Sequence, residues 1–217
     1  MRAWAVGGDF QARALLCSDP MARTGLTEIR IHGRGGQGNV VAAYLLATAA
    51  FEAGRFGQAF PSFGPERRGA PVAAFVRIAD RPVRLRSQVH NPRFLIIQDE
   101  KLLHVSGITG GLLPGGGVLV NSRRSAEQLR VPGAARTVTI PATALAIEIL
   151  GLPVPNTALV AAFLALTELL PLAALEKALA RRFQGEMLDR NRRLVGAAAA
   201  RVQAAVWQEE AERAATA

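Results

Sequence analysis

Residues Thr27 to Gly54 read TEIRIHGRGGQGNVVAAYLLATAAFEAG, a short alternating segment followed by glycines and then by an apolar run. Thr27–His32 alternates polar and apolar residues, which predicts a β-strand. Asn39–Ala53 places its apolar residues on one wide helical face, and Gly54 is a suitable helix stop. A strand, a glycine turn and a helix in this order predict an α/β layer structure.

The turn itself, GRGGQG, carries glycines at the spacing G-x-G-x-x-G, namely Gly33, Gly35 and Gly38. In such a turn the first glycine permits the bend, the second admits a ligand close to the backbone, and the third lets helix and strand pack tightly. The helix that follows offers N–H donors and partial positive charge to an anion. The same glycines also fit a plain tight turn without a ligand, or the close approach of a partner protein.

A dinucleotide site requires an acidic residue about twenty residues further on, to bind a ribose hydroxyl. The sequence there is EAGRFGQAFPSFG, in which Glu52 still belongs to the predicted helix. We therefore disfavour NAD binding. An NADP-type dehydrogenase, with Arg67 or Arg68 binding the 2′-phosphate, stays as an alternative.

A second distinctive segment is PSFGPERRGAP, Pro61 to Pro71, which we predict to be a loop. Its paired arginines, Arg67 and Arg68, suit phosphate or carboxylate because a guanidinium offers two parallel donors. An exposed loop with an ordinary Glu66–Arg pair is the alternative interpretation.

The rest of the first part predicts further strands and one short helix. Val72–Ala79 and Pro82–Ser87 read as a hairpin that turns at Asp80-Arg81. The remaining candidates are a strand at Phe94–Gln98 covered on both faces, a helical segment at Lys101–Val105, and strands at Gly117–Asn121 and Thr137–Ile140. Gln98, Asp99 and Glu100 follow a covered strand, at the edge where open α/β sheets bind ligands.

From Pro155 onward the sequence predicts helices. NTALVAAFLALTELL has Asn156 in a capping position, LAALEKALARRF is a second helix, and residues 185 to about 214 form a third. We expect an extension over residues 1–26 and one domain over 27–217, with an α/β layer to about residue 150 and a helical part from about 151.

The composition excludes several classes of protein. Half of the 217 residues are hydrophobic, one cysteine and three histidines are present, and the net charge is +9. The single cysteine, Cys17, cannot hold an iron–sulfur cluster, and the histidines lack metal-ligand spacing, so we expect no metal site. Arginines are spread along the chain rather than clustered, which disfavours nucleic-acid binding. We find no signal peptide and no membrane span, and expect a cytoplasmic protein.

Several segments together resemble one family: GRGGQG, AFPSFGPERRGAPVAAFVRI, RPVRLRSQV, NPRFLIIQDEKLL and PNTALVAAFLALTELLPLAALEKALARRF. In this order they resemble the gamma subunit of 2-oxoacid:acceptor oxidoreductases of the pyruvate/ketoisovalerate:ferredoxin type. The resemblance runs from about Glu28 to Gln208.

The resemblance implies a multi-subunit enzyme that converts a 2-oxoacid and coenzyme A to acyl-CoA, carbon dioxide and two electrons. It implies thiamine diphosphate with magnesium, and [4Fe-4S] clusters, in the companion alpha, beta and delta subunits, with ferredoxin or another acceptor taking the electrons. The resemblance implies that the gamma chain is a Rossmann-like sheet flanked by helices, inactive alone, that helps to enclose coenzyme A. Neither the oxoacid nor the acceptor follows from this sequence.

The resemblance also implies site residues, all of them binding rather than catalytic. The loop Gly35, Gly36, Gln37 and Gly38 faces the active-site side, Arg67 and Arg68 lie in a basic loop near coenzyme A, and Asn156 reaches coenzyme A from the start of a helix. Asn156 fits a purely structural helix cap equally well. A structural interaction subunit that touches no small molecule is the alternative function.

Overall fold

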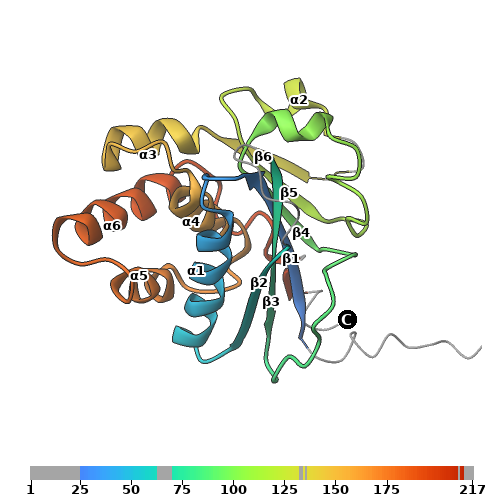
Figure 1. Ribbon diagram of the computed structural model, residues 1–217, viewed down its shortest axis with the longest axis horizontal. Coiled ribbons are helices and arrows are strands. Elements are labelled where there is room, and N and C mark those ends of the chain that lie inside the picture. Colours follow the sequence, from blue (N-terminus) through green and yellow to red (C-terminus); the bar gives the residue numbers. More distant parts are fainter. Residues whose placement is uncertain (1–24, 63–69, 132–133, 135, 210, 213–217) are drawn as a thin grey trace, which may run out of the picture.

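A computed structural model describes residues 25–62, 70–131, 134, 136–209 and 211–212. Its centre is a six-stranded sheet with strand order β2-β3-β1-β4-β5-β6 (Figure 1). The strands are β1 (Thr27–Arg34), β2 (Phe56–Ser62), β3 (Pro71–Ala79), β4 (Phe94–Ile97), β5 (Gly117–Asn121) and β6 (Arg136–Ile140).

Four of the strands, β1, β4, β5 and β6, are parallel to one another. Strand β3 pairs antiparallel with β1 and with the edge strand β2. The carboxyl ends of the four parallel strands therefore meet at one edge of the sheet, the edge at which α/β folds bind ligands. The predicted α/β, Rossmann-like class is confirmed.

Helices cover one face of the sheet, on the left in Figure 1. They are α1 (Asn39–Glu52), α3 (Ala142–Leu150), α4 (Asn156–Thr167), α5 (Leu172–Ala180) and α6 (Gly185–Ala199). The 3₁₀ helix η2 (Glu100–His104) and the short α2 (Ala126–Leu129) follow β4 and β5. None of the helices in the described ranges is long and apolar enough to span a membrane.

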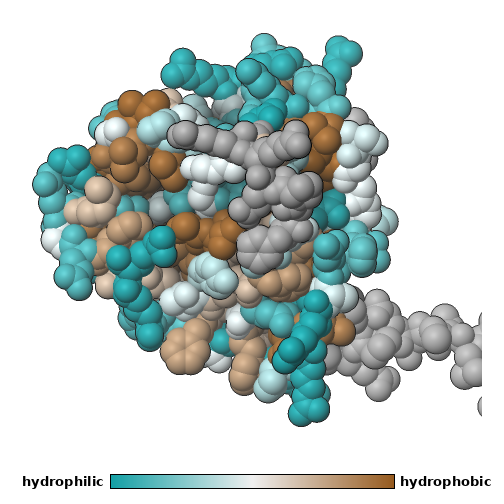
Figure 2. Space-filling view, in the orientation of Figure 1, coloured by the Kyte–Doolittle hydropathy of each residue, from teal (hydrophilic) through white to brown (hydrophobic). Residues whose placement is uncertain are grey.

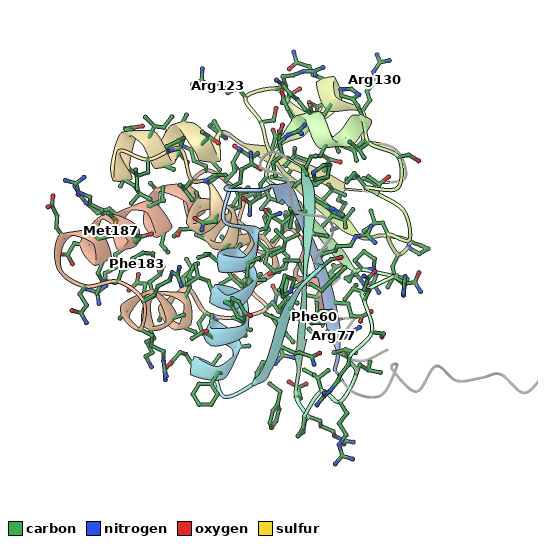
Figure 3. The ribbon with its side chains drawn as sticks, in the orientation of Figure 1. Phe60, Arg77, Arg123, Arg130, Phe183 and Met187 are labelled. Carbon is green, nitrogen blue, oxygen red and sulfur yellow. The ribbon has the colours of Figure 1, made fainter. Side chains whose placement is uncertain are left out.

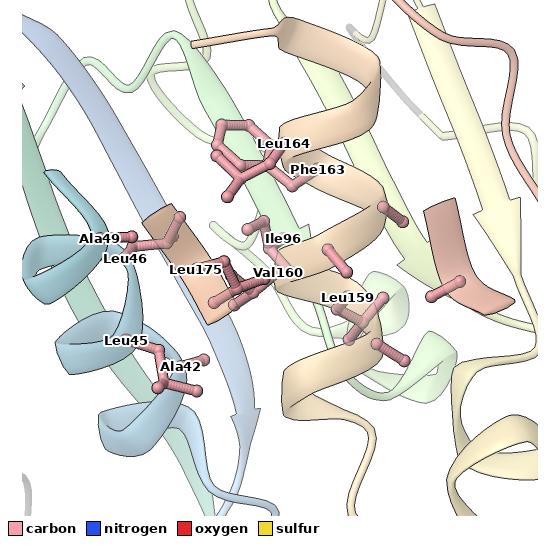
Figure 4. Close-up of a cluster of buried hydrophobic side chains, with 14 of the residues drawn as sticks. Ala42, Leu45, Leu46, Ala49, Ile96, Leu159, Val160, Phe163, Leu164 and Leu175 are labelled. Carbon is pink, nitrogen blue, oxygen red and sulfur yellow. The ribbon is translucent and has the colours of Figure 1, made fainter. Parts of the chain in front are cut away.

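The main hydrophobic core lies between the sheet and this helical layer (Figure 4). All twelve residues of α4 are buried, because the sequence NTALVAAFLALT is apolar on every side. Val160 and Phe163 of α4 belong to the same core cluster as Ile96 of β4 and Leu46 of α1. This packing fixes the beginnings of α1 and α4 relative to the carboxyl edge of the sheet.

The opposite face of β1 and β3 carries buried charged side chains and is crossed by an irregular segment. Pro82–Ser87, predicted as a strand, is not one; it belongs to this irregular segment. Arg77 Nη1 donates to the carbonyl of Leu85 at 3.4 Å, and Arg30 Nη1 to that of Val89 at 3.5 Å. The side chains of the sheet thus bind the carbonyls that a strand would use for pairing.

The antiparallel partner of β3 on its outer side is β2, which the sequence did not predict. Phe60 of β2 pairs in register with Phe75, and its ring lies 5.3 Å from the guanidinium carbon of Arg77 (Figure 3). Pro61 and Ser62 belong to β2 rather than to the predicted loop, and residues 63–69 of that loop lie outside the described ranges.

Further differences concern helices. The sequence did not predict α2 or α3, and α6 ends at Ala199 rather than near residue 214. The predicted helix near Lys101–Val105 is confirmed as the 3₁₀ helix η2, and the strands at Phe94, Gly117 and Thr137 are also confirmed. The proposed extension over residues 1–26 lies almost wholly outside the described residues.

The helical side of the molecule exposes some hydrophobic surface, visible over α3 in Figure 2. Ile147 is 52% exposed and Leu152 is 47% exposed. Tyr44 and Phe51 of α1, at 51% and 66%, are exposed as well. Such side chains are typical of surfaces that contact another protein.

Candidate functional site

The glycine turn joins β1 to α1 through two residues with positive φ. Gly36 has φ 95° and Gly38, the residue that precedes α1, has φ 80°. L-residues with a side chain avoid this region, so the glycines are required by the backbone path. Gln37 closes the turn, since its N–H donates to the Arg34 carbonyl at 3.1 Å and its Oε1 accepts from Arg34 N at 2.7 Å.

Helix α1 begins at this turn without a side-chain cap and without an acidic residue in its first turn. The first N–H groups of a helix have no partner inside the helix. They carry the positive end of the helix dipole, which favours an anion. An anion at this turn stays a prediction, and the uncapped helix start is compatible with it.

Asn156 lies directly against the last glycine of the turn. A Cβ atom built on Gly38 would be 2.7 Å from Asn156 Nδ2, so that a side chain at this position requires Asn156 to move. Two residues that are remote in the sequence, both predicted as site residues, are thus in contact.

The predicted capping position of Asn156 is wrong, because the N-cap of α4 is Pro155 and no side chain of the described residues caps this helix. Pro155 is the residue before α4, and Asn156 is its first residue. The Oδ1 of Asn156 accepts from Thr157 N at 2.7 Å, while its Nδ2 faces Gly38. One end of the amide stabilises the helix start and the other end faces the glycine turn.

An ion pair ties the turn to the end of β4. Arg34 Nε donates to Asp99 Oδ2 at 2.5 Å, and Asp99 Oδ1 accepts from Lys101 N at 2.9 Å at the start of η2. Arg34 and Asp99 lie at the carboxyl ends of neighbouring parallel strands. This pair links the turn to the next loop along the edge.

The role of Gly33 differs from the one expected. It lies inside β1, where a Cβ would be 2.2 Å from Asn39 Oδ1 of α1. Gly33 is therefore the glycine that lets helix and strand pack closely, a role predicted for Gly38. Asn39 Nδ2 donates to the Val72 carbonyl at 2.8 Å, which fixes the first residue of α1 to β3.

The remaining candidates along this edge are less closely connected to the turn. Arg67 and Arg68 lie outside the described residues. Glu100, the first residue of η2, accepts from Ser122 Oγ and so contacts the loop after β5 rather than the glycine turn. A surface pocket of about 460 Å³ lies there, lined by Ser122, Arg123, Arg124, Ser125, Thr139, Pro141 and Ala144.

The titratable groups near β1 are buried and do not resemble a catalytic acid–base pair. Burial, and to a lesser degree the charge of Arg30, lowers the pKa of His32 to about 4. Its Nε2 accepts from Arg30 Nε at 2.9 Å, which requires the neutral imidazole. In the part of the chain that the structure describes, no three His, Cys, Asp or Glu side chains are grouped to hold a metal ion.

Comparison with known proteins places the fold and this turn in one family. Residues 28–201 match the family model described as pyruvate ferredoxin/flavodoxin oxidoreductase. The chain belongs to this family.

The relatives are subunits of such enzymes. A pyruvate synthase subunit PorC of Methanosarcina barkeri is 51% identical over 64% of this chain and 76% of its own length. The pyruvate/ketoisovalerate oxidoreductases common subunit gamma of Thermococcus kodakarensis is 44% identical over 76% and 91%. The crystal structure of a pyruvate oxidoreductase subunit from Thermotoga maritima superposes with a TM-score of 0.73 at 36% identity, covering 83% of this chain and 98% of that one.

Proposed function

We propose that this chain is the gamma subunit of an enzyme that oxidatively decarboxylates a 2-oxoacid with coenzyme A. The observation that supports this most directly is the family match over residues 28–201 combined with relatives that are themselves gamma-type subunits. The contact between Gly38 and Asn156 adds to it, because two residues implied to approach coenzyme A meet at one helix N-terminus.

The redox groups of such an enzyme do not fit this chain. A [4Fe-4S] cluster is held by cysteine thiolates, and Cys17 is the only cysteine. In the proposed complex thiamine diphosphate with magnesium activates the oxoacid and the clusters carry electrons, all within the companion alpha, beta and delta subunits. This chain then contributes binding and enclosure rather than chemistry.

The proposed role of its residues is to bind the phosphates of coenzyme A. The N-terminus of α1, which follows the turn Gly35, Gly36, Gln37 and Gly38, offers the backbone donors of its first turn. The N–H groups of Gly35 and Gln37 already donate to the carbonyls of Ala70 and Arg34, so these two residues shape the turn. Arg67 and Arg68 would add two guanidinium forks, which pair with phosphate oxygens. Asn156 Nδ2 supports the same turn from α4. A subunit closed over the active site also excludes water from a reactive intermediate.

The test is steady-state kinetics of the complex reconstituted from all of its subunits. Arg67→Ala/Arg68→Ala is expected to raise the KM for coenzyme A roughly tenfold or more, since two charge-assisted contacts are lost. Arg192→Ala/Arg193→Ala, an adjacent pair on α6, is the matched control and should leave KM unchanged. An intact complex with an unaltered KM in the first variant would count against the proposed role.

The exposed Tyr44 and Phe51 of α1 favour a second candidate, a subunit that only assembles the complex. In that case the arginine variants change neither KM nor kcat, whereas Tyr44→Ala/Phe51→Ala weakens assembly. An NADP-type dehydrogenase is distinguished separately, since the chain alone would then bind the nicotinamide nucleotide. Copurification of the chain with its companions from the cytoplasm would support the proposed partners and compartment.

A further inference from the structure

Gln98, the residue directly after β4, carries a fully buried carboxamide. Its backbone is well bonded, since its N–H donates to the His32 carbonyl at 2.8 Å and its carbonyl accepts from Asn121 Nδ2 at 2.9 Å. Within the described ranges, however, neither its Oε1 nor its Nε2 has a hydrogen-bond partner. Burying a polar group in this way costs free energy, so the position needs an explanation.

The strand register places this side chain next to the glycine turn. Ile97 of β4 pairs with His32 of β1, so the next residue, Gln98, lies beside Gly33. Side chains alternate along a strand, and Gln98 therefore shares the face of Ile96. Ile96 packs in the core beneath α1 and α4 (Figure 4). Gln98 thus points into the layer directly under the start of α1.

Asn39, the first residue of α1, has a buried acceptor without a donor in the described part of the chain, which complements the unpaired donor of Gln98. Its Nδ2 donates to the Val72 carbonyl, but its Oδ1 is buried and has no partner among the residues described. That oxygen lies over Gly33, since a Cβ there would be 2.2 Å from it. The unpaired acceptor, Asn39 Oδ1, and the unpaired donor, Gln98 Nε2, therefore lie on the same face of the sheet. The strands beneath them, β1 and β4, are neighbours about 4.8 Å apart.

We propose that Gln98 is a positioning residue that acts through Asn39 on the glycine turn. In the ligand-free chain the Gln98 Nε2–Asn39 Oδ1 hydrogen bond is not made. This hydrogen bond forms when an anionic ligand binds at the N-terminus of α1 and the first turn of the helix moves toward that ligand. The inference rests on the proposed function, which supplies coenzyme A as that ligand.

The free-energy consequence is a conflict between stability and function at one residue. In the ligand-free chain the buried amide is a cost, so an apolar side chain of similar length should fit better. In the bound state the new hydrogen bond favours the ligand-holding position of the turn. Positions that violate a folding rule in this way are expected at functional sites.

Asn121 provides a matched control in the same row of the sheet. Its amide is fully bonded, because its Nδ2 donates to Thr143 Oγ1 at 2.7 Å and its Oδ1 accepts from Thr143 N at 3.1 Å. Its bonds serve the fold, joining β5 to the start of α3. The two carboxamides therefore predict opposite effects of an apolar substitution.

The first measurement is the melting temperature of the full-length chain without ligand. Gln98→Met should raise it by about 2–4 °C, whereas Asn121→Leu should lower it by at least that amount. A fall in melting temperature for Gln98→Met comparable to that for Asn121→Leu would show that the Gln98 amide has structural partners, such as a bound water, and would overturn the proposal.

The second measurement is kinetics of the reconstituted complex. Gln98→Met should raise the KM for coenzyme A roughly fivefold, the factor of one ordinary hydrogen bond, with kcat nearly unchanged. In the Gln98→Met background, Asn39→Ala should add less to KM than it does alone, because both act through one bond. A stabilised variant with unaltered KM would refute the positioning role. Failure of the proposed function is distinguishable, since Arg67→Ala/Arg68→Ala would then leave the KM for coenzyme A unaltered as well.

Discussion

Arg77 Nε donates to Glu28 Oε1 at 2.7 Å, and the two side chains are only 2% and 9% exposed. Removing one member of a buried ion pair leaves the other charge without compensation. We expect Arg77→Met to lower the free energy of unfolding by about 3–5 kcal/mol, measured by urea denaturation. The double variant Arg77→Met/Glu28→Leu should recover most of that loss. A single variant that loses less than about 1 kcal/mol would contradict the role of the pair.

His32 predicts a dependence of stability on pH. Burial, followed by the charge of Arg30, lowers its pKa to about 4 in the folded chain, against about 6.5 when unfolded. Between these values the unfolded chain binds a proton that the folded chain does not, so the free energy of unfolding falls as pH falls from about 6.5 to about 4. The total is up to about 3 kcal/mol. Between pH 6.5 and pH 4 the free energy of unfolding of wild type should therefore fall more than that of His32→Gln, as denaturation curves would measure; an equal fall in both would refute the effect.

Alanine substitutions at Gly38 and Gly36 can be compared to measure the contact with Asn156. Both have positive φ, but among the residues that the structure describes only Gly38 has a neighbour where a Cβ would stand. Each alanine should cost about 1–2 kcal/mol for the backbone conformation. Gly38→Ala should cost more, because of Asn156. Adding Asn156→Ala should reduce the extra cost of Gly38→Ala, as a double-mutant cycle would measure; equal costs for the two glycines would argue against the contact.

Substitution of Asp99 tests its ion pair with Arg34, which links the turn to η2. Its side chain is 17% exposed and that of Arg34 is 33% exposed. Asp99→Asn should lower the free energy of unfolding by up to about 1 kcal/mol in 0.1 M salt, and by less in 1 M salt because of screening. Asp80→Asn is the control, since Asp80 pairs with Arg55 but is 60% exposed. We expect Asp80→Asn to lower the free energy of unfolding less than Asp99→Asn does, and a larger loss at Asp80 would contradict this order.

Local patterns were enough to predict β1, the glycine turn and α1. They failed for β2, whose sequence FGQAFPS contains residues that disfavour strands. Gly57 is there because a Cβ would be 2.3 Å from the Ala47 carbonyl, so the strand lies tightly against α1. Pro61 is tolerated because β2 is an edge strand. Both reasons depend on tertiary neighbours that the sequence does not reveal.

The opposite error at Pro82–Ser87 has a related cause. The segment PVRLRS alternates apolar and charged residues as an exposed strand does. Its carbonyl at Leu85 is bound by Arg77 from the strand beneath. In the candidate site, the family resemblance indicated Asn156 as a binding residue. Its contact with Gly38, and the unpaired amides of Gln98 and Asn39, are visible only in the fold.

The helical layer and the irregular segment over β1 and β3 are held to the sheet by different forces. On the helical face the sheet packs on a continuous apolar core, whereas the segment that contains Leu85 and Val89 is bound to its face largely through arginine side chains and backbone carbonyls. Coverings with few apolar contacts open at lower free energy than a packed core. Amide hydrogens of this irregular segment should therefore exchange with deuterium well before those of α4, and the segment can loosen from β1 and β3 while the helical layer stays folded.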